Sequence, residues 1–206
     1  MRVPGRWRRD LQCVLISEAQ IARRVRSLAR EIERELSGSP GGELVVVSLL
    51  NGTVLFLADL IRHLQRPMRL DFMGVSSYRQ GTAPGKLEFS RGLKLDVRGR
   101  DVLLVDDILD TGRTLHRVIR HLRQFKPRTI RTCVLLDKPA RRVKDLKADH
   151  AGFVIPEVFV VGYGMDYAER YRNLPFVGVL HPRMIASVPD GKRKIGHESG
   201  PEPVRK

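Results

Sequence analysis

The chain has 206 residues, of which 42% are hydrophobic, and a formal net charge of +15 at pH 7. This length predicts one domain with enough apolar material for a core. No apolar run approaches the roughly 20 residues that span a bilayer, and no signal-peptide-like segment follows the basic start. Cys13 and Cys133 lie among apolar residues, which favours reduced core thiols, so we expect a cytoplasmic protein with no membrane partner.

The positive charge admits more than one explanation. The 38 lysines and arginines are spread along the chain, so the charge can reflect solvated, arginine-rich helix faces. It can also attract an anionic small substrate or nucleic acid. The chain has neither a zinc-ligand spacing nor an aromatic-interleaved RNA motif, and these absences disfavour nucleic acid.

The first part of the chain alternates predicted helices and strands. Ser17-Glu18-Ala19-Gln20 matches a capping box, after which apolar residues recur at helical spacing as far as Leu36. The apolar run 44–50, with three valines, predicts a buried strand that stops at Asn51-Gly52. A helix over 54–64 and an alternating strand over 69–75 follow.

Residues 76–100 are different, because glycine and proline interrupt them repeatedly. Only short alternating pieces, such as Lys86–Phe89, could pair as a hairpin. A long irregular segment in a compact α/β domain is often a flexible lid over an active site, and the alternative is a tolerated surface insertion.

Residues 102–114 carry the densest chemical signal. The apolar run 102–105 predicts a strand buried on both faces, as in a parallel sheet. It leads to three carboxylates and then to Thr-Gly-Arg-Thr (111–114), ahead of a helical pattern. A loop at a helix N-terminus presents free backbone N–H groups, which suit a phosphate. Carboxylates beside it can bind sugar hydroxyls, a proton or a metal.

The rest of the chain continues the alternation. Strands are predicted over 129–136, 159–164 and 177–180, with a break at Lys138–Arg142. From Pro189 onward, glycine, proline and charge predict a disordered basic tail (189–206) after a single domain over 1–188. The predicted fold class is α/β, with a mostly parallel central sheet flanked by helices and a site at the carboxyl ends of the strands.

Two other folds share parts of this pattern. Leu-Leu-Val-Asp-Asp also opens receiver domains, and Lys138-Pro139 is superficially like their terminal Lys-Pro. A receiver needs a phospho-accepting aspartate and its strand between these elements, where only one helix and one strand fit. A dinucleotide-binding fold needs Gly-x-Gly-x-x-Gly after an early strand, and none is present. Both alternatives fail on spacing.

The apolar strand, two acidic residues and Asp-Thr-Gly-x-Thr resemble the phosphoribosyl diphosphate (PRPP) motif of type I phosphoribosyltransferases. Within that family the chain most resembles hypoxanthine-guanine phosphoribosyltransferases, from about Ser17 to Leu180. The resemblance implies a small hood beside the central sheet and a long lid. It also implies transfer of the 5-phosphoribosyl group from PRPP to hypoxanthine or guanine, giving IMP or GMP and pyrophosphate, in purine salvage.

The resemblance also assigns residues to the phosphates. Thr111, Gly112, Arg113 and Thr114 would hold the 5′-phosphate. Leu50, Asn51 and Gly52 match the pyrophosphate-binding loop, in which family members carry a non-proline cis peptide. The family usually has Lys or Arg where Asn51 stands, so only the backbone role carries over. The remaining pyrophosphate contacts are assigned to Ser77-Tyr78, which begins the lid, and to Arg172.

Further residues are assigned to the ribose, the metal and the purine. Asp106 and Asp107, the first in place of a common glutamate, would bind the ribose hydroxyls directly or through Mg²⁺, the implied cofactor. Asp110 would act as the general base that takes the proton from purine N7. The predicted purine contacts are Lys138, Phe159, Val160 and Asp166. Asp166 would also lie near a second Mg²⁺, and the relatives imply a homodimer or homotetramer.

The main alternative is an RNA-binding pyrimidine-operon regulator that resembles uracil phosphoribosyltransferase. Its motif also reads Asp-Asp…Thr-Gly-Arg-Thr, and the basic charge would fit RNA. That family usually lacks an acid where Asp110 stands, since a pyrimidine has no N7, and it lacks the Lys138 and Phe159-Val160 arrangement. Specificity for xanthine differs only in the base pocket and stays open.

Overall fold

The computed structural model describes residues 2–38, 43–78 and 86–186, with residues 76–78, 86–88 and 186 described by their backbone alone. The centre of the predicted lid (79–85) and the predicted tail (189–206) lie outside the described residues. The side chains of Ser77 and Tyr78 lie outside them too.

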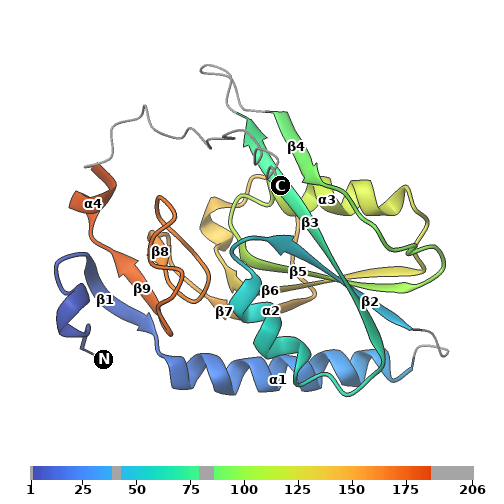
Figure 1. Ribbon diagram of the computed structural model, residues 1–206, viewed down its shortest axis with the longest axis horizontal. Coiled ribbons are helices and arrows are strands. Elements are labelled where there is room, and N and C mark those ends of the chain that lie inside the picture. Colours follow the sequence, from blue (N-terminus) through green and yellow to red (C-terminus); the bar gives the residue numbers. More distant parts are fainter. Residues whose placement is uncertain (1, 39–42, 79–85, 187–206) are drawn as a thin grey trace, which may run out of the picture.

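A six-stranded sheet forms the centre of the molecule, in the order β4-β3-β2-β5-β6-β7 (Figure 1). All neighbours are parallel except β3 and β4, so the predicted fold class is confirmed. The strands are β2 (Leu44–Leu50), β3 (Met68–Tyr78), β4 (Lys86–Arg91), β5 (Asp101–Leu109), β6 (Thr129–Asp137) and β7 (His150–Val154).

Helices cover both faces of this sheet. On one face α1 (Glu18–Leu36) and α2 (Val54–Ile61) pack against Val46 and Leu103, and on the other α3 (Arg113–Arg123) packs against Val47 and Leu104 (Figure 1). Successive strand residues point to opposite faces, so two covered faces require the continuous apolar runs seen in the sequence. The predicted capping box is confirmed: the Ser17 hydroxyl accepts a hydrogen bond from the backbone N–H of Gln20. No helix in the described ranges is long and apolar enough to cross a bilayer.

A second, antiparallel sheet forms the hood, in the order β1-β9-β8. Its strands are β1 (Leu11–Ile16), β8 (Val160–Val161) and β9 (Val177–Leu180), with the short helix α4 (Pro182–Ala186) beside them (Figure 1). We did not predict β1, β7 or α4, which are too short to give a periodic signal. The expectation that Cys13 is a core residue is wrong: β1 is an edge strand and the thiol is exposed, whereas Cys133 is buried.

The predicted lid is narrower than its proposed bounds. β4 pairs with the end of β3 as an antiparallel hairpin, as the alternation at Lys86–Phe89 indicated. After β4, Val97 is fully buried in the core, and Leu93 and Leu95 pack beside it. The buried Asp71 carboxylate accepts hydrogen bonds from the N–H groups of Lys94 and Leu95. The segment after Arg91 is therefore packed against the sheet instead of forming part of a flexible loop.

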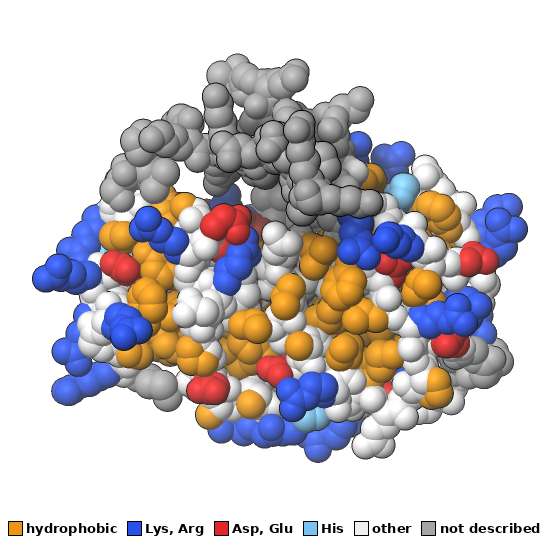
Figure 2. All heavy atoms as spheres, in the orientation of Figure 1, with side chains coloured by type: hydrophobic (Ala, Val, Ile, Leu, Met, Phe, Trp, Pro, Cys, Tyr) orange, Lys and Arg blue, Asp and Glu red, His pale blue; other side chains and the backbone are white. Residues whose placement is uncertain are grey.

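Charge is distributed around the molecule. On the face shown in Figure 2, lysine and arginine side chains lie around the margin, with apolar side chains and a few acids between them. They do not gather into one stripe on that face.

Candidate active site

The candidate site lies where three parallel neighbours, β2, β5 and β6, end. Because their carboxyl ends meet at one edge of the sheet, the loops after Leu50, Leu109 and Asp137 are brought together. β5 lies in the middle of the three. The loop that follows it holds the central position at this edge.

Asp106 and Asp107 belong to β5 itself, which continues to Leu109 beyond the predicted end of the strand. Burial raises the pKa of Asp106 well above its ordinary value, and the neighbouring Asp107 charge adds to the effect. Burial also raises the pKa of Asp107, although hydrogen bonds and the positive charge of Arg172 oppose it. In the described part of the chain no ion pair reaches either carboxylate. Two adjacent, half-buried acids of this kind are stabilised by a hard cation, so they fit Mg²⁺, which usually takes one or two carboxylates plus substrate oxygens and water.

The loop between β2 and α2 lies against these acids. The Leu50–Asn51 peptide bond is cis, as the resemblance implied. Gly52 follows it, and a Cβ at this position would lie 1.7 Å from the Asp107 carboxylate oxygen. On the other side, a Cβ on Gly164 would lie 2.0 Å from the Gly52 carbonyl oxygen. The loop is therefore held between the Asp107 side chain and the backbone of the hood.

The loop after β5 is held on one side by hydrogen bonds that three of its successive carbonyl groups accept. The Leu109 carbonyl accepts from the Lys138 N–H at 2.9 Å, and the Thr111 carbonyl accepts from the N–H groups of Val143 and Lys144 at 3.1 and 3.3 Å. The Asp110 carbonyl accepts from Arg142 Nε at 3.0 Å. The C=O and N–H of a trans peptide unit point in opposite directions, so the following N–H groups point away from these partners.

That geometry is suited to an anion. The three N–H groups belong to Asp110, Thr111 and Gly112, and α3 begins directly after them with Gly112 at φ +79°. Consecutive amides on one side of a turn, together with a helix N-terminus, form a concave anion site. This arrangement is compatible with a phosphate at the predicted loop 111–114.

The Asp110 side chain lies beside this loop and is about one-third exposed. Its Oδ1 atom is buried and has no hydrogen-bond partner within the described ranges, while Arg141 Nε lies 3.4 Å away. Arg141 belongs to the short 3₁₀ turn η2 (Pro139–Arg141) and also lies 3.6 Å from Glu157. An acceptor oxygen without a hydrogen bond is available to take a proton from a bound base.

Lys138 and the hood segment at 158–160 come together, as predicted. Lys138 is buried, and its Nζ donates to the Val158 carbonyl at 2.6 Å. Burial lowers the pKa of Lys138, and the Asp110 carboxylate opposes that effect. The Phe159 ring is 40% exposed and contacts Tyr167 edge-on, whereas Val160 is buried within β8. An exposed aromatic face beside a lysine can stack on a planar base while the lysine donates to its oxygen.

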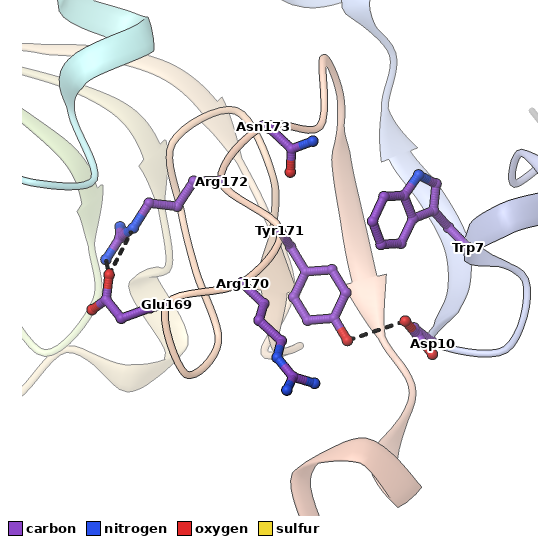
Figure 3. Close-up of a pocket in the computed structure, with 7 residues that line it drawn as sticks. All are labelled: Trp7, Asp10, Glu169, Arg170, Tyr171, Arg172 and Asn173. Atoms are coloured by element: carbon purple, nitrogen blue, oxygen red, sulfur yellow. Dashed lines mark hydrogen bonds and ion pairs between the residues drawn. The ribbon is translucent and has the colours of Figure 1, made fainter. Parts of the chain in front are cut away.

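Asp166 and Arg172 lie in the hood loop, where they pair with each other. Arg172 contacts Asp166 at 3.0 Å and donates to the Gly164 carbonyl. It also contacts Glu169 at 2.9 Å (Figure 3). The assignment of Asp166 to a second Mg²⁺ stays a prediction. In the structure the Arg172 guanidinium offsets the charge of the Asp166 carboxylate.

The far side of this loop is held by the start of the chain. The Tyr171 hydroxyl donates to Asp10 at 3.1 Å, and the Trp7 ring contacts Tyr171 edge-on (Figure 3). These three residues help to line a hollow of about 500 Å³. Tyr171 has φ +74°, a left-handed conformation that such packing must stabilise. The position of Arg172 therefore depends on residues that precede the recognisable motifs.

Sequence reasoning missed the residues that hold the phosphate loop. Arg141 and Arg142 were interpreted only as part of a break after a strand, Lys144 was given no role, and Gly164 was assigned to a strand. Their contacts join residues more than 30 positions apart, as in the hydrogen bond from Arg142 to Asp110. No periodicity or local spacing encodes such a pairing.

Comparison with known proteins agrees with this geometry. A family model for the phosphoribosyl transferase domain matches residues 16–168. The chain therefore belongs to the phosphoribosyltransferase family, in the group of the hypoxanthine-guanine phosphoribosyltransferases. This confirms the family resemblance, and the pyrimidine-type alternative is not favoured.

Individual relatives support the same group. The chain is 43% identical over 179 residues to the hypoxanthine-guanine phosphoribosyltransferase of Bacillus subtilis, covering 86% of this chain and 98% of the relative. It is also 44% identical to bifunctional TilS/HprT proteins of Listeria monocytogenes, of whose length the match spans only 27%. A crystal structure of a Bacillus anthracis hypoxanthine-guanine phosphoribosyltransferase has a TM-score of 0.78 at 43% identity, covering 83% of this chain and 99% of that one.

Proposed function

We propose that this chain transfers the 5-phosphoribosyl group from PRPP to a 6-oxopurine, hypoxanthine or guanine, giving IMP or GMP and pyrophosphate in purine salvage. One observation carries the proposal. Asp110 Oδ1 accepts no hydrogen bond among the described residues; Asp110 belongs to the candidate anion-binding loop at residues 110–112, and its carboxylate acts electrostatically on the buried Lys138. A phosphate loop, a proton acceptor and a lysine in one neighbourhood support a purine nucleotide as the product. The names of the relatives support the same activity.

The residues take separate roles in this proposal. Amides 110–112 and the side chains of Thr111, Arg113 and Thr114 hold the 5′-phosphate. Asp106 and Asp107 hold the ribose hydroxyls, and Mg²⁺, when bound by them and the substrate, neutralises their charge and that of pyrophosphate. Arg172 exchanges its Asp166 and Glu169 partners for the leaving pyrophosphate, beside the backbone of Leu50, Asn51 and Gly52.

The purine side of the site uses Lys138 and Asp110. Lys138 donates to the exocyclic oxygen of the base while Phe159 stacks on its ring and the Val160 backbone meets its edge. As N9 attacks C1′, Asp110 accepts the N7 proton. Positive charge develops on the ribose, and closure of the segment that begins at Ser77-Tyr78 excludes water from it. Asp166, which pairs with Arg172 at 3.0 Å, is assigned to the purine amino group and to a second Mg²⁺.

Two broader features belong to this proposal. We expect residues 1–188 to act as one catalytic domain in the cytoplasm, with 189–206 as an appended basic tail. We also expect a homodimer or homotetramer; a related Trypanosoma cruzi enzyme was studied for the role of its C-terminal region in oligomeric state. Light scattering on the purified chain measures the assembly directly.

A base panel tests the activity. Purified protein with PRPP and MgCl₂ is offered hypoxanthine, guanine, xanthine, adenine and uracil, and nucleotide formation is followed by chromatography. We expect IMP or GMP to form, and EDTA to abolish turnover. Conversion of uracil alone, or of no base, would contradict the proposal, and conversion of xanthine would define the preference within the 6-oxopurines.

A further inference from the structure

Arg142 is nearly enclosed at the back of the candidate phosphate loop. Only 13% of its side chain is exposed. Its guanidinium donates to the carbonyls of Asp110 at 3.0 Å and Leu109 at 3.3 Å, and it also contacts the Leu146 carbonyl and the Asp137 carboxylate. One side chain therefore links the end of β5, the end of β6 and the loop after β6.

The chain leaves room for this arrangement at Gly112. A Cβ on Gly112 would lie 3.2 Å from Arg142 Cδ and 3.5 Å from Lys144 Cβ. Gly112 also has φ +79°, which residues with a side chain rarely adopt. Glycine at this position thus serves both the turn into α3 and the close approach of the arginine.

The two carbonyls that Arg142 holds determine where two amides point. Because it fixes the C=O groups of Leu109 and Asp110, it turns the N–H groups of Asp110 and Thr111 to the opposite side, toward the phosphate site. It also fixes the backbone from which the Asp110 side chain projects. The Asp137 contact ties the same guanidinium to the residue before Lys138.

We propose that Arg142 is a positioning residue of the reaction: it orients the phosphate-binding amides and the Asp110 carboxylate without touching substrate. The kinetic consequences of this inference rest on the proposed function, whereas the expected effect of Arg142 on phosphate binding does not. A planar guanidinium with five donors reaches several acceptors at once, and a lysine ammonium cannot span them. The positive charge alone is therefore insufficient.

Arg131 offers a matched control. It lies on β6, near the end of that strand opposite to the site, with 19% of its side chain exposed. It donates to Glu35 at 2.6 Å and to Thr129 at 2.8 Å. If Arg142 served only stability, lysine at either position would have similar consequences.

The experiment compares Arg142→Lys, Arg131→Lys and the unaltered chain. Dissociation constants for GMP are measured by calorimetry, kcat and KM for PRPP by assay, and Tm by scanning calorimetry. Loss of a hydrogen bond to a charged group predicts that Arg142→Lys weakens GMP binding and raises the KM for PRPP by about 10- to 100-fold. kcat should fall as well. Arg131→Lys should lower Tm to a similar extent but leave binding and kinetics within about twofold.

Chemical rescue separates positioning from folding. Guanidinium chloride, far below denaturing concentration, should restore much of the GMP affinity and turnover of Arg142→Ala, whereas ammonium chloride should not. If Arg142→Ala does not fold, Asp137→Asn, which removes one partner of the guanidinium, should shift GMP affinity in the same direction by less. Unchanged GMP binding in Arg142→Lys, or equal changes in Arg131→Lys, would overturn the proposal. An inactive unaltered chain that still binds GMP would overturn only the proposed function.

Discussion

The two ends of β5 carry aspartates in opposite circumstances. At the start of the strand, Asp101 is 3% exposed and is paired with Arg128 at 2.9 and 2.5 Å and with the Thr129 hydroxyl at 2.7 Å. At the other end, Asp106 and Asp107 are adjacent and only half-buried, and among the described residues no ion pair reaches them. Burial raises the pKa of both.

The difference separates two uses of the same residue type. A buried carboxylate with a hydrogen-bonded cation stabilises the fold, and removing its partner is costly. A buried carboxylate without one lowers stability and is retained where a ligand supplies the positive charge or the hydroxyl donors. We therefore expect substitutions at the first end of β5 to change stability and substitutions at the second end to change activity.

The largest expected effect is at Asp110, just beyond the end of β5. Asp110→Asn keeps the shape but removes the proton acceptor, so kcat should fall by about 10²- to 10⁴-fold with little change in Tm. Turnover at saturating substrates and scanning calorimetry measure the two quantities. A rate near that of the unaltered chain would remove Asp110 from the mechanism.

A paired substitution tests the comparison directly. Asp107→Asn should lower kcat/KM by about 10- to 100-fold through weaker ribose and Mg²⁺ contacts, and should leave Tm unchanged or raised. Asp101→Asn should lower Tm by about 5 °C and leave kcat/KM within about twofold at temperatures where it is folded. Reversed outcomes, with Asp107→Asn less stable and Asp101→Asn inactive, would refute the division between the two ends.

Two glycines test how closely the backbone packs around the Asp107 end of β5. In Gly164→Ala the new Cβ meets the Gly52 backbone oxygen, and φ is +98°, so we expect a loss of about 1–3 kcal/mol of stability. In Gly52→Ala the new Cβ meets the movable Asp107 carboxylate, so activity should fall more than stability. Urea denaturation with parallel assays distinguishes the two, and equal stability losses would show that the Asp107 side chain cannot move aside.

The smallest expected effect is a pH dependence of stability. The folded-state pKa of Asp106 is raised above its ordinary value of 3.8. At pH values between the unfolded-state and folded-state pKa, the folded chain therefore binds more protons than the unfolded chain. Protonation of Asp106 therefore stabilises the folded chain at pH values below this interval, and the stabilisation is lost as pH rises through it. Asp106→Asn lacks this loss, so its Tm should exceed that of the unaltered chain at neutral pH and converge with it near about pH 4.

Scanning calorimetry without Mg²⁺ at a series of pH values measures this difference. Parallel Tm curves for the two proteins would contradict the assignment of a raised pKa to Asp106. Addition of Mg²⁺ with PRPP should stabilise the unaltered chain more than Asp106→Asn, because the variant has lost one negative charge.

Much of the architecture follows from local pattern. The runs 44–50 and 102–105 are strands with both faces buried, and the capping box at Ser17 starts α1. The predicted end of the strand before Asp106 was wrong, because pairing with β6 extends β5 to Leu109 regardless of its polar residues. Short or edge elements such as β1 and β7 were missed, because a strand of so few residues shows no clear alternation of apolar and polar side chains.

The sequence by itself determined the family, the fold class and the strand-carboxylate-loop order around Asp110, because periodicity and motif spacing are properties of neighbouring residues. Only the tertiary structure decided that Arg142 holds the carbonyls of Leu109 and Asp110, that Asp166 pairs with Arg172, and that Gly52 lies between Asp107 and Gly164. These contacts join segments far apart in the chain. They depend on which strands are neighbours in the sheet and on how closely two backbones approach, neither of which leaves a local pattern.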